Sequence, residues 1–254
     1  MYYKAITLYS KEEKIEYAEI KDLLWHFLFT LECNGQILKH YKIIEKENFL
    51  LYVTTPKQDS LDEKYDGCYV KKDKEEILKH FNLQIEDCGI DLESQSYCDC
   101  NKRTAMEMQT YDRDVDSVFT CCDCGKPIAL YELPYPKDSE DYCAIQWWQD
   151  NYAAMDMLWM NCLCDRHTGN QRVKFDSPLN KQGIEIAQYM SQQLQYPVYY
   201  HLACDYGKSI KTEKVNDKIT HICPKCEKTM KRMKFSEDHE RDICKNCNLS
   251  FDAH

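Results

Sequence analysis

The sequence predicts an α+β protein with more than one domain. Two observations carry this prediction: β-rich and helical patterns alternate through the first ninety residues, and close pairs of cysteines appear from about Asp91 onward. A chain of 254 residues is long enough for two or three small domains. We expect a ferredoxin-like α+β domain over residues 1–91, a cysteine-rich α+β domain over residues 92–207, and a basic linker with a small C-terminal module over residues 208–254.

The first domain reads as strand, helix, strand, strand, helix, strand. The first helix carries apolar residues at helical spacing and ends at Asn34-Gly35, and Pro56 ends the third strand. This order is that of a ferredoxin-like split βαβ unit, a fold that indicates no function by itself. The predicted segments are residues 3–9, 20–31, 36–44, 48–54, 74–81 and 83–90.

Two strong helices mark the second domain. The helix predicted over residues 141–160 has an aromatic stripe, which is more often part of a core than a base-stacking surface. Ser177 and Pro178 open the next helix as N-cap and first residue, and a strand follows Pro197. Beyond Gly207 the lysine-rich chain predicts a linker or an exposed hairpin. The stripe consists of Ile145, Trp148, Tyr152, Met155 and Trp159.

Charge is distributed unevenly along the chain. The net charge is -10, but residues 1–207 hold 22 basic and 35 acidic residues, whereas residues 208–254 hold 11 basic and 8 acidic ones. An acidic body opposes attraction to phosphate backbones, and a basic tail favours it. The basic tail is therefore the only electrostatic argument for a nucleic-acid partner.

The cysteines are expected to be reduced. The chain shows neither an export signal at its start nor the roughly 18 consecutive apolar residues of a membrane span, so we expect a cytoplasmic protein without membrane contact. In that setting paired cysteines indicate metal ligands rather than disulfides. The isolated Cys33, Cys68 and Cys88 are interpreted as ordinary buried small side chains.

The C-terminal module contains a strong metal-binding motif. Cys223-Pro-Lys-Cys226 is followed after seventeen residues by Cys244-Lys-Asn-Cys247. Two such Cys-x-x-Cys turns can supply four thiolates to one tetrahedral Zn²⁺, and structural zinc contributes roughly 10–16 kcal/mol to the folding of small domains. We therefore predict a C-terminal zinc ribbon with one structural zinc ion, whose closed ligand set leaves no catalytic position.

A second set of cysteines could bind another zinc ion. Cys121 and Cys124, followed by a glycine, have the same spacing, and Cys98 and Cys100 precede them by about twenty residues. Only one residue separates Cys98 from Cys100, which is tighter than the usual two to four, so both a second zinc site and its absence stay open. Cys122 would be a spare thiol beside that site.

The common enzyme signatures are absent from the sequence. Cys162, Cys164 and His167 are candidates by residue type for metal ligation or for a nucleophilic pair, but the sequence shows no base and orienting group around them. No H-E-x-x-H, Walker, G-x-S-x-G or Rossmann pattern occurs. We therefore expect a binding protein and not an enzyme.

Several blocks together resemble a prokaryotic family of unknown function described as Zn-ribbon-containing and as a candidate for nucleic-acid binding. They are C-C-D-C-G-K-P-I-A-L-Y-E-L-P at residues 121–134, I-Q-W-W-Q-D-N-Y-A-A-M-D-M-L-W-M-N-C at 145–162, S-P-L-N-K-Q-G-I-E-I at 177–186, P-V-Y-Y-H-L at 197–202, and the terminal ribbon. The resemblance covers roughly half of the chain. It implies zinc ligation, with a first turn at Cys121 and Cys124 and with Cys122 where a glycine is usual, whereas residues 163–167 depart from the pattern.

Two functions follow from these features. The basic flank of the ribbon could dock on the phosphates of nucleic acid, through Lys225, Lys228, Lys231, Arg232 and Lys234. Alternatively, the acidic body could capture a basic protein, as an immunity protein does when it neutralises a toxin. We expect nucleic acid by a narrow margin.

Overall fold

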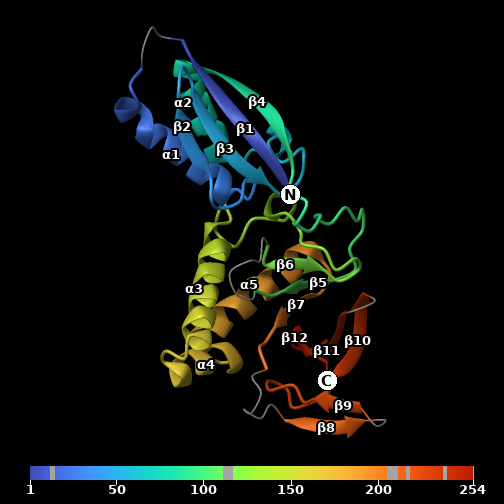
Figure 1. The fold of residues 1–254 in the computed structure, drawn as a ribbon. Helices are drawn as coiled ribbons and strands as arrows, with labels where there is room; N and C mark the ends of the chain where they lie inside the picture. The colour runs from blue at the N-terminus through green and yellow to red at the C-terminus, as the bar shows by residue number, and fades with distance from the viewer. Residues whose placement is uncertain (12–14, 111–116, 205–210, 216–217, 237–238, 254) are drawn as a thin grey trace. The chain divides into compact units, whose positions relative to one another are not determined.

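The computed structural model describes residues 1–254 except 12–14, 111–116, 205–210, 216–217, 237–238 and 254. The described part contains helices and several sheets, so the α+β class is confirmed (Figure 1). It divides into two compact units: Met1–Tyr97 with Ala129–Cys143, and Cys98–Ile128 with Ala144–His254. The division into three domains stays a prediction.

Unit 1 contains a four-stranded sheet whose elements follow the predicted order. The strand order is β2-β3-β1-β4, and every pair of neighbours is antiparallel. The second helix begins at Cys68 rather than at Lys74, directly after the N-cap residue Gly67. The elements are β1 (Tyr2–Ser10), α1 (Tyr17–Cys33), β2 (Lys42–Glu45), β3 (Phe49–Thr55), α2 (Cys68–His80) and β4 (Phe81–Ile90).

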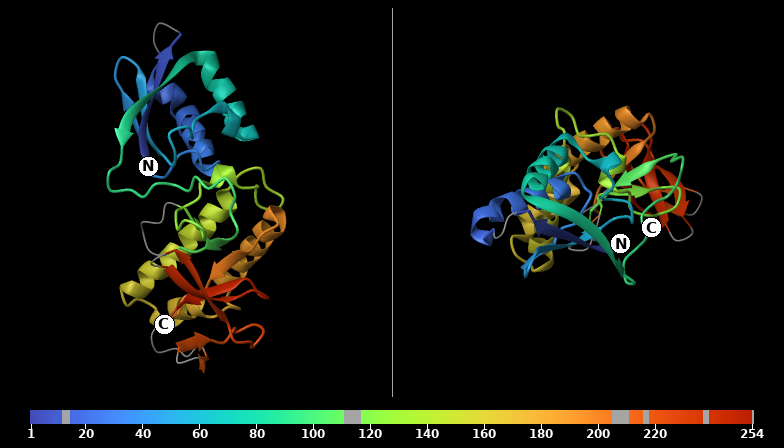
Figure 2. Two further views of the ribbon diagram at one scale, coloured as in Figure 1. Left: turned by 90° about the vertical axis from the view of Figure 1, so that its right-hand side faces the viewer. Right: turned by 90° about the horizontal axis from the view of Figure 1, so that it is seen from above.

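Both helices of unit 1 share one core with the sheet. Ile6 and Leu8 of β1 point to the same face, where they meet Leu51 of β3 and apolar residues of both helices. The left view of Figure 2 shows these helices to one side of the strands. The helical residues of this core are Ile20, Leu24, Phe27, Leu28, Leu31, Val70 and Ile77.

The segment 129–143 belongs to unit 1 although it follows part of unit 2 in sequence. A disulfide joins Cys33 to Cys143, and the Tyr142 N–H donates to the Cys33 carbonyl at 2.7 Å. The interpretation of Cys33 as an ordinary buried side chain is therefore wrong, because its partner lies 110 residues away and no local pattern reveals it. The same interpretation is wrong for Cys68 and Cys88, which are exposed free thiols.

Unit 2 contains a six-stranded sheet in the order β10-β11-β12-β7-β5-β6. The central pairs β12–β7 and β7–β5 are parallel, and the other pairs are antiparallel. The expected exposed hairpin forms a separate pair of strands, β8 (Thr212–Val215) and β9 (Lys218–His221). The sheet strands are β5 (Met106–Met108), β6 (Phe119–Cys121), β7 (Val198–His201), β10 (Lys231–Ser236), β11 (His239–Cys244) and β12 (Leu249–Asp252).

Three helices accompany this sheet: α3 (Cys143–Met160), α4 (Asp165–Val173) and α5 (Pro178–Leu194). Ser177 caps α5 as predicted, by accepting a hydrogen bond from the Asn180 N–H at 3.2 Å. A Cβ at Gly183 would lie 2.3 Å from Tyr200 of β7 and 2.8 Å from Trp148 of α3, so only glycine permits this close packing.

The aromatic stripe of α3 is buried over only part of its length. Ile145, Trp148 and Tyr152 are buried, as predicted for a core surface. Trp159 is 37% exposed, and the Arg172 guanidinium lies 4.2 Å from its ring centroid. Among the helices that the structure describes, none is both long and apolar enough to cross a membrane.

Candidate metal centres

The first cysteine cluster combines the two pairs whose joint role the sequence left open. Its four sulfur atoms all lie within 4.8 Å of one another. Around a tetrahedral zinc ion with bonds of about 2.3 Å, neighbouring sulfurs would be about 3.8 Å apart, so a small adjustment closes the site. This first cluster consists of Cys98 and Cys121, which are buried, and Cys100 and Cys124, which are half-buried.

The second cluster is the set predicted for the C-terminal module. Its sulfur atoms also lie within 4.8 Å of one another, and those of Cys226 and Cys244 are 3.5 Å apart. Four convergent sulfurs are a donor set that suits Zn²⁺. The second cluster consists of Cys223, Cys226, Cys244 and Cys247.

The same backbone turn builds the Cys121–Cys124 pair of the first cluster and the Cys223–Cys226 pair of the second. In the first cluster the Gly125 N–H donates to the Cys121 carbonyl at 2.8 Å, and the Cys121 N–H donates to the Lys126 carbonyl at 2.9 Å. In the second cluster Glu227, Cys223 and Lys228 repeat both hydrogen bonds, each at 2.9 Å.

This turn requires a left-handed residue after its second cysteine. Gly125 has φ +71°, Glu227 has φ +56° and Asn248, after the other pair of the second cluster, has φ +53°. Glycine and asparagine adopt such angles readily, whereas Glu227 adopts them at a cost. The Cys98-x-Cys100 pair instead has a hydrogen bond between its own two residues, since the Cys100 N–H donates to the Cys98 sulfur at 3.4 Å.

Each cluster has one thiol that is readily ionised, as metal ligation requires. The Lys228 backbone N–H lowers the pKa of Cys226 to about 7. Burial acts to raise the pKa of Cys98, but hydrogen bonds from the Arg103 side chain and the Cys100 N–H outweigh it and bring that pKa to about 7. Burial raises the pKa of Cys121 to about 12. A bound dication would favour the loss of such remaining protons.

The other candidate thiols lie outside both clusters. Cys122 is buried beside Ala105, Tyr199 and Ile243, and burial raises its thiol pKa far above the ordinary value. Cys162 and Cys164 are exposed, both with positive φ, at the junction of α3 and α4. Within the described part of the chain, the ligand atoms of three or more metal-ligating side chains all come within 4.8 Å of one another only at the two clusters. His167 is exposed on α4 and belongs to neither of them.

The predicted nucleic-acid-binding residues do not all have the same surroundings. Lys225, Lys228, Lys231 and Lys234 are exposed, around the Cys223–Cys226 turn and along β10. Arg232 is half-buried, and it donates to the Asp242 carboxylate at 3.0 Å and to the Ile219 carbonyl at 2.8 Å. These internal contacts make Arg232 a structural residue in this arrangement.

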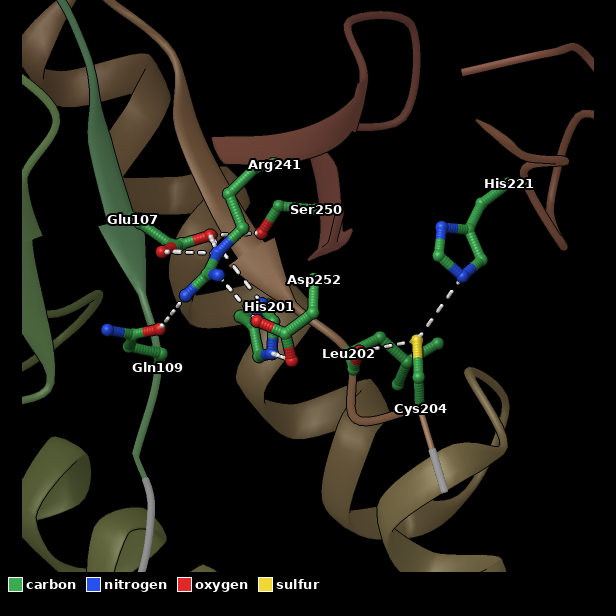
Figure 3. Close-up of polar contacts among 9 residues, drawn as sticks. All are labelled: Glu107, Gln109, His201, Leu202, Cys204, His221, Arg241, Ser250 and Asp252. Atoms are coloured by element: carbon green, nitrogen blue, oxygen red, sulfur yellow. Dashed lines mark hydrogen bonds and ion pairs between the residues drawn. The ribbon is translucent and has the colours of Figure 1, made fainter. Parts of the chain in front are cut away.

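A buried group of polar side chains joins the strands of unit 2 (Figure 3). Glu107 of β5 accepts hydrogen bonds from Arg241 of β11 at 3.1 Å and from Ser250 of β12 at 2.6 Å. His201 of β7 lies 3.6 Å from both Glu107 and Asp252. This group therefore links β5, the strand beside the first cluster, to β11, which ends at Cys244, and to β12, which begins two residues after Cys247.

The charged side chains of this group shift one another's pKa values toward the ionised forms. Burial would lower the pKa of His201, but Asp252 and Glu107 outweigh that effect and raise it. In turn, the hydrogen bond from His201 is the main cause that brings the pKa of Asp252 to about 2. When His201 is protonated, it and Arg241 together balance the two carboxylates.

Sequence reasoning missed a thiol, an imidazole and a carboxylate that lie in line. The Cys204 sulfur points toward His221 (Figure 3) and lies 3.8 Å from its Nε2, and His221 Nδ1 is 2.9 Å from Asp242. This is the order of a nucleophile, its base and an orienting group, and 3.8 Å is a long hydrogen bond to sulfur. The three residues are far apart in sequence and form no recognisable motif, so no sequence signal could have identified them.

Asp242 also accepts a hydrogen bond from Arg232. Asp242 lies two residues before Cys244, and His221 likewise lies two residues before Cys223. This group therefore connects β9, β10 and β11, the strands that adjoin the ligands of the second cluster.

Comparisons with known proteins relate both units to families without an assigned activity. Residues 1–87 match a family described as Domain of unknown function (DUF8589), and residues 100–203 match Domain of unknown function (DUF2310). An "Uncharacterized protein" of Haemophilus influenzae is 26% identical over 190 residues, which cover 71% of this chain and 68% of that protein. No solved structure matches. The second matched segment includes Cys100, Cys121 and Cys124 but ends before the second cluster.

Proposed function

We propose that this chain is a non-enzymatic zinc-binding protein that docks on nucleic acid through lysines around its second cluster. The observation that carries the proposal is the placement of four exposed lysines beside four convergent cysteines. A ferredoxin-like unit 1 and a zinc ribbon around the second cluster belong to the same proposal. The strand order β2-β3-β1-β4 and the paired Cys-x-x-Cys turns support these two assignments.

Zinc fits both clusters better than the other common metal ions do. Four thiolates suit Zn²⁺ or an iron–sulfur centre, and a structural zinc site needs only the four converging sulfurs. A closed set of four ligands leaves no coordination position for water or substrate, which favours a structural role for both ions.

The lysine surface is defined here as Lys225, Lys228, Lys231 and Lys234. The Cys223–Cys226 turn fixes the first two, and the other two lie on β10, which is an edge strand of the sheet. None of the four makes an ion pair with another residue of the described ranges. Ammonium groups with this freedom can replace counterions on a phosphate backbone.

The test is to replace the four lysines by glutamine and to measure binding to a single-stranded and a double-stranded oligonucleotide at several salt concentrations. Four phosphate contacts give a slope of about -3 to -4 in log K against log salt. Between 50 and 200 mM salt, the unmodified protein should therefore lose about 100-fold more affinity than the variant.

The matched control replaces four exposed lysines of unit 1, Lys21, Lys42, Lys71 and Lys72, by glutamine. This control keeps the same net charge as the test variant, so it separates a local contact from a general charge effect. Equal affinity and salt slope in the test variant and the unmodified protein would exclude the lysine surface as the docking site.

A second candidate function rests on the charge of unit 1. Its residues, 1–97 and 129–143, contain 23 acidic and 14 basic side chains, whereas unit 2 is nearly neutral with 20 and 19. Such an excess attracts a basic protein and accelerates the encounter. The alternative proposal is therefore that unit 1 captures a basic partner, as an immunity protein captures a toxin.

A further inference from the structure

Unit 1 contains a pocket of about 190 Å³ that neither the zinc clusters nor the lysine surface uses. It lies between the last turns of α1, the first turn of α2 and the acidic residues that precede α3, all within unit 1. Concave sites with apolar walls and a few convergent polar groups are the usual form of a ligand site. The chemistry of the walls indicates which ligand would fit.

The walls of the pocket are aromatic. Phe29 of α1 is 44% exposed and Tyr69 of α2 is 47% exposed, so both rings have surface available to a ligand. Val70, which is buried, adds an apolar floor. Ring faces attract cations, and the carbon stems of long basic side chains pack well on such surfaces.

Two carboxylates line the pocket, and each has an oxygen atom that can accept a further hydrogen bond. Glu140 Oε2 accepts the thiol hydrogen of Cys68 at 3.0 Å, and Asp141 Oδ1 accepts the Cys143 N–H at 3.0 Å. Each carboxylate uses one oxygen in these contacts, so Glu140 Oε1 and Asp141 Oδ2 can accept hydrogen bonds from a ligand. Glu140 contacts the first residue of α2, and Asp141 lies just before the first residue of α3.

The charge of the surroundings favours a cationic ligand. Among the residues that the structure describes, no lysine or arginine lines the pocket. The titratable lining residue on α1 is His26, whose Nδ1 is held by the buried Asp73 at 2.7 Å. Unit 1 as a whole has nine more acidic than basic residues.

We propose that this pocket receives an arginine side chain of a basic protein partner. A planar guanidinium can stack on aromatic rings and donate to two carboxylates at once, which an ammonium cannot do equally well. The inference rests on the alternative function proposed above, because it names the side chain by which unit 1 would hold its basic partner.

The experiment uses the zinc-loaded full chain and two small probes, N-acetyl-arginine amide and its neutral isostere N-acetyl-citrulline amide. Binding is followed by the NMR shifts of labelled phenylalanine and tyrosine rings. The arginine probe should shift signals of Phe29 and Tyr69 in a saturable manner, about tenfold more tightly than the citrulline probe. N-acetyl-lysine amide should bind between the two.

The double variant Glu140→Gln and Asp141→Asn should abolish the preference for arginine over citrulline. The amide oxygen of asparagine can still accept the Cys143 N–H, so this contact at the start of α3 is kept. The matched control changes the exposed Glu45 and Glu47 to glutamine, which removes the same charge elsewhere in unit 1 and should leave the preference intact. Phe29→Leu should weaken both probes.

Equal binding of arginine and citrulline, no saturable binding, or a preference that survives the double variant would each overturn the proposal. The nucleic-acid assay on the double variant distinguishes a failure of the pocket proposal from a failure of the lysine surface. The double variant keeps the lysine surface, so it should bind nucleic acid as the unmodified protein does. A basic protein that copurifies with a chain whose pocket does not bind arginine would leave the partner function standing and refute only the pocket.

Discussion

Replacing Cys244 by serine should destabilise all of unit 2 and not only its C-terminal strands. Cys244 is the last residue of β11 and a member of the second cluster, and β12 begins shortly after its neighbour Cys247. Because β12 pairs with β7 in the parallel centre of the sheet, the ligands hold strands that also support β5 and the first cluster.

The buried side chains of β11 and β12 set the size of the effect. Ile243, Leu249 and Phe251 are each at most 1% exposed, and full burial of such a side chain contributes about 1.5–3 kcal/mol. Releasing both strands would therefore remove about 5–9 kcal/mol, which is comparable to the total stability of about 5–15 kcal/mol of a typical domain. The contacts of Arg241, Ser250 and Asp252 with Glu107 and His201 would be lost as well.

Native mass spectrometry and hydrogen exchange together test this prediction. The variant should carry one zinc ion fewer than the unmodified protein and should lose exchange protection in β5, β7, β11 and β12, while unit 1 keeps its own. Cys88→Ser, at an exposed thiol of unit 1, is the control and should change neither measurement. Full zinc retention would refute the ligand assignment, and unchanged protection of β5 and β7 would refute the energetic coupling across the sheet.

Two further predictions concern the first cluster and the buried polar group. Cys121→Ser should lose the zinc ion of the first cluster. Cys122→Ser should keep that ion but lower the free energy of unfolding by about 1–3 kcal/mol, because the serine hydroxyl would be buried without a hydrogen-bond partner. Native mass spectrometry that shows the ion lost in Cys122→Ser and kept in Cys121→Ser would contradict the ligand assignment. Since the folded pKa of His201 is raised, its stabilising contribution is complete below its ordinary value near 6.5 and is lost as the pH rises through the folded value. Urea unfolding of unit 2 between pH 6 and 8 should therefore show stability falling with pH, and His201→Gln should reduce that slope; identical slopes would refute the role.

The features that sequence reasoning predicted correctly are local ones. The order of the elements of unit 1 follows from apolar periodicity and from the stop signals Asn34-Gly35 and Pro56, and Ser177 identifies the start of α5. The second cluster could be predicted because each of its Cys-x-x-Cys pairs is a single turn. Only the convergence of the two pairs required the fold.

The features that escaped prediction depend on contacts between distant segments. Cys33 and Cys143 are 110 residues apart, and Glu107 and Arg241 are 134 residues apart. The strands β5 and β6 have three residues each, too few to show an alternating pattern. The joint position of Cys98 and Cys100 with Cys121 and Cys124 likewise depends on the pairing of these short strands.

The position of the clusters in the sheet explains why a structural metal would matter here. The first cluster includes Cys121, the last residue of the edge strand β6, and the second includes Cys244, the last residue of β11 near the opposite edge. Between them, parallel pairing joins β5, β7 and β12, strands of three or four residues from distant parts of the chain. Bringing such distant strands together costs a large loop-closure entropy. Because the strands are short, they form few hydrogen bonds with one another to offset that cost.

Metal ions bound at the two clusters would fix the strands toward both edges of the sheet and would offset part of that entropy cost. The same ions would fix the lysine surface, because Lys225 lies between the ligands Cys223 and Cys226 and the Lys228 carbonyl accepts a hydrogen bond from the Cys223 N–H. Chelation of zinc should therefore abolish nucleic-acid binding as completely as replacing the lysines does, even though it leaves every lysine in the chain. Binding that persists after both ions are removed would show that the lysines act as a flexible charged segment and not as a surface built by the metal.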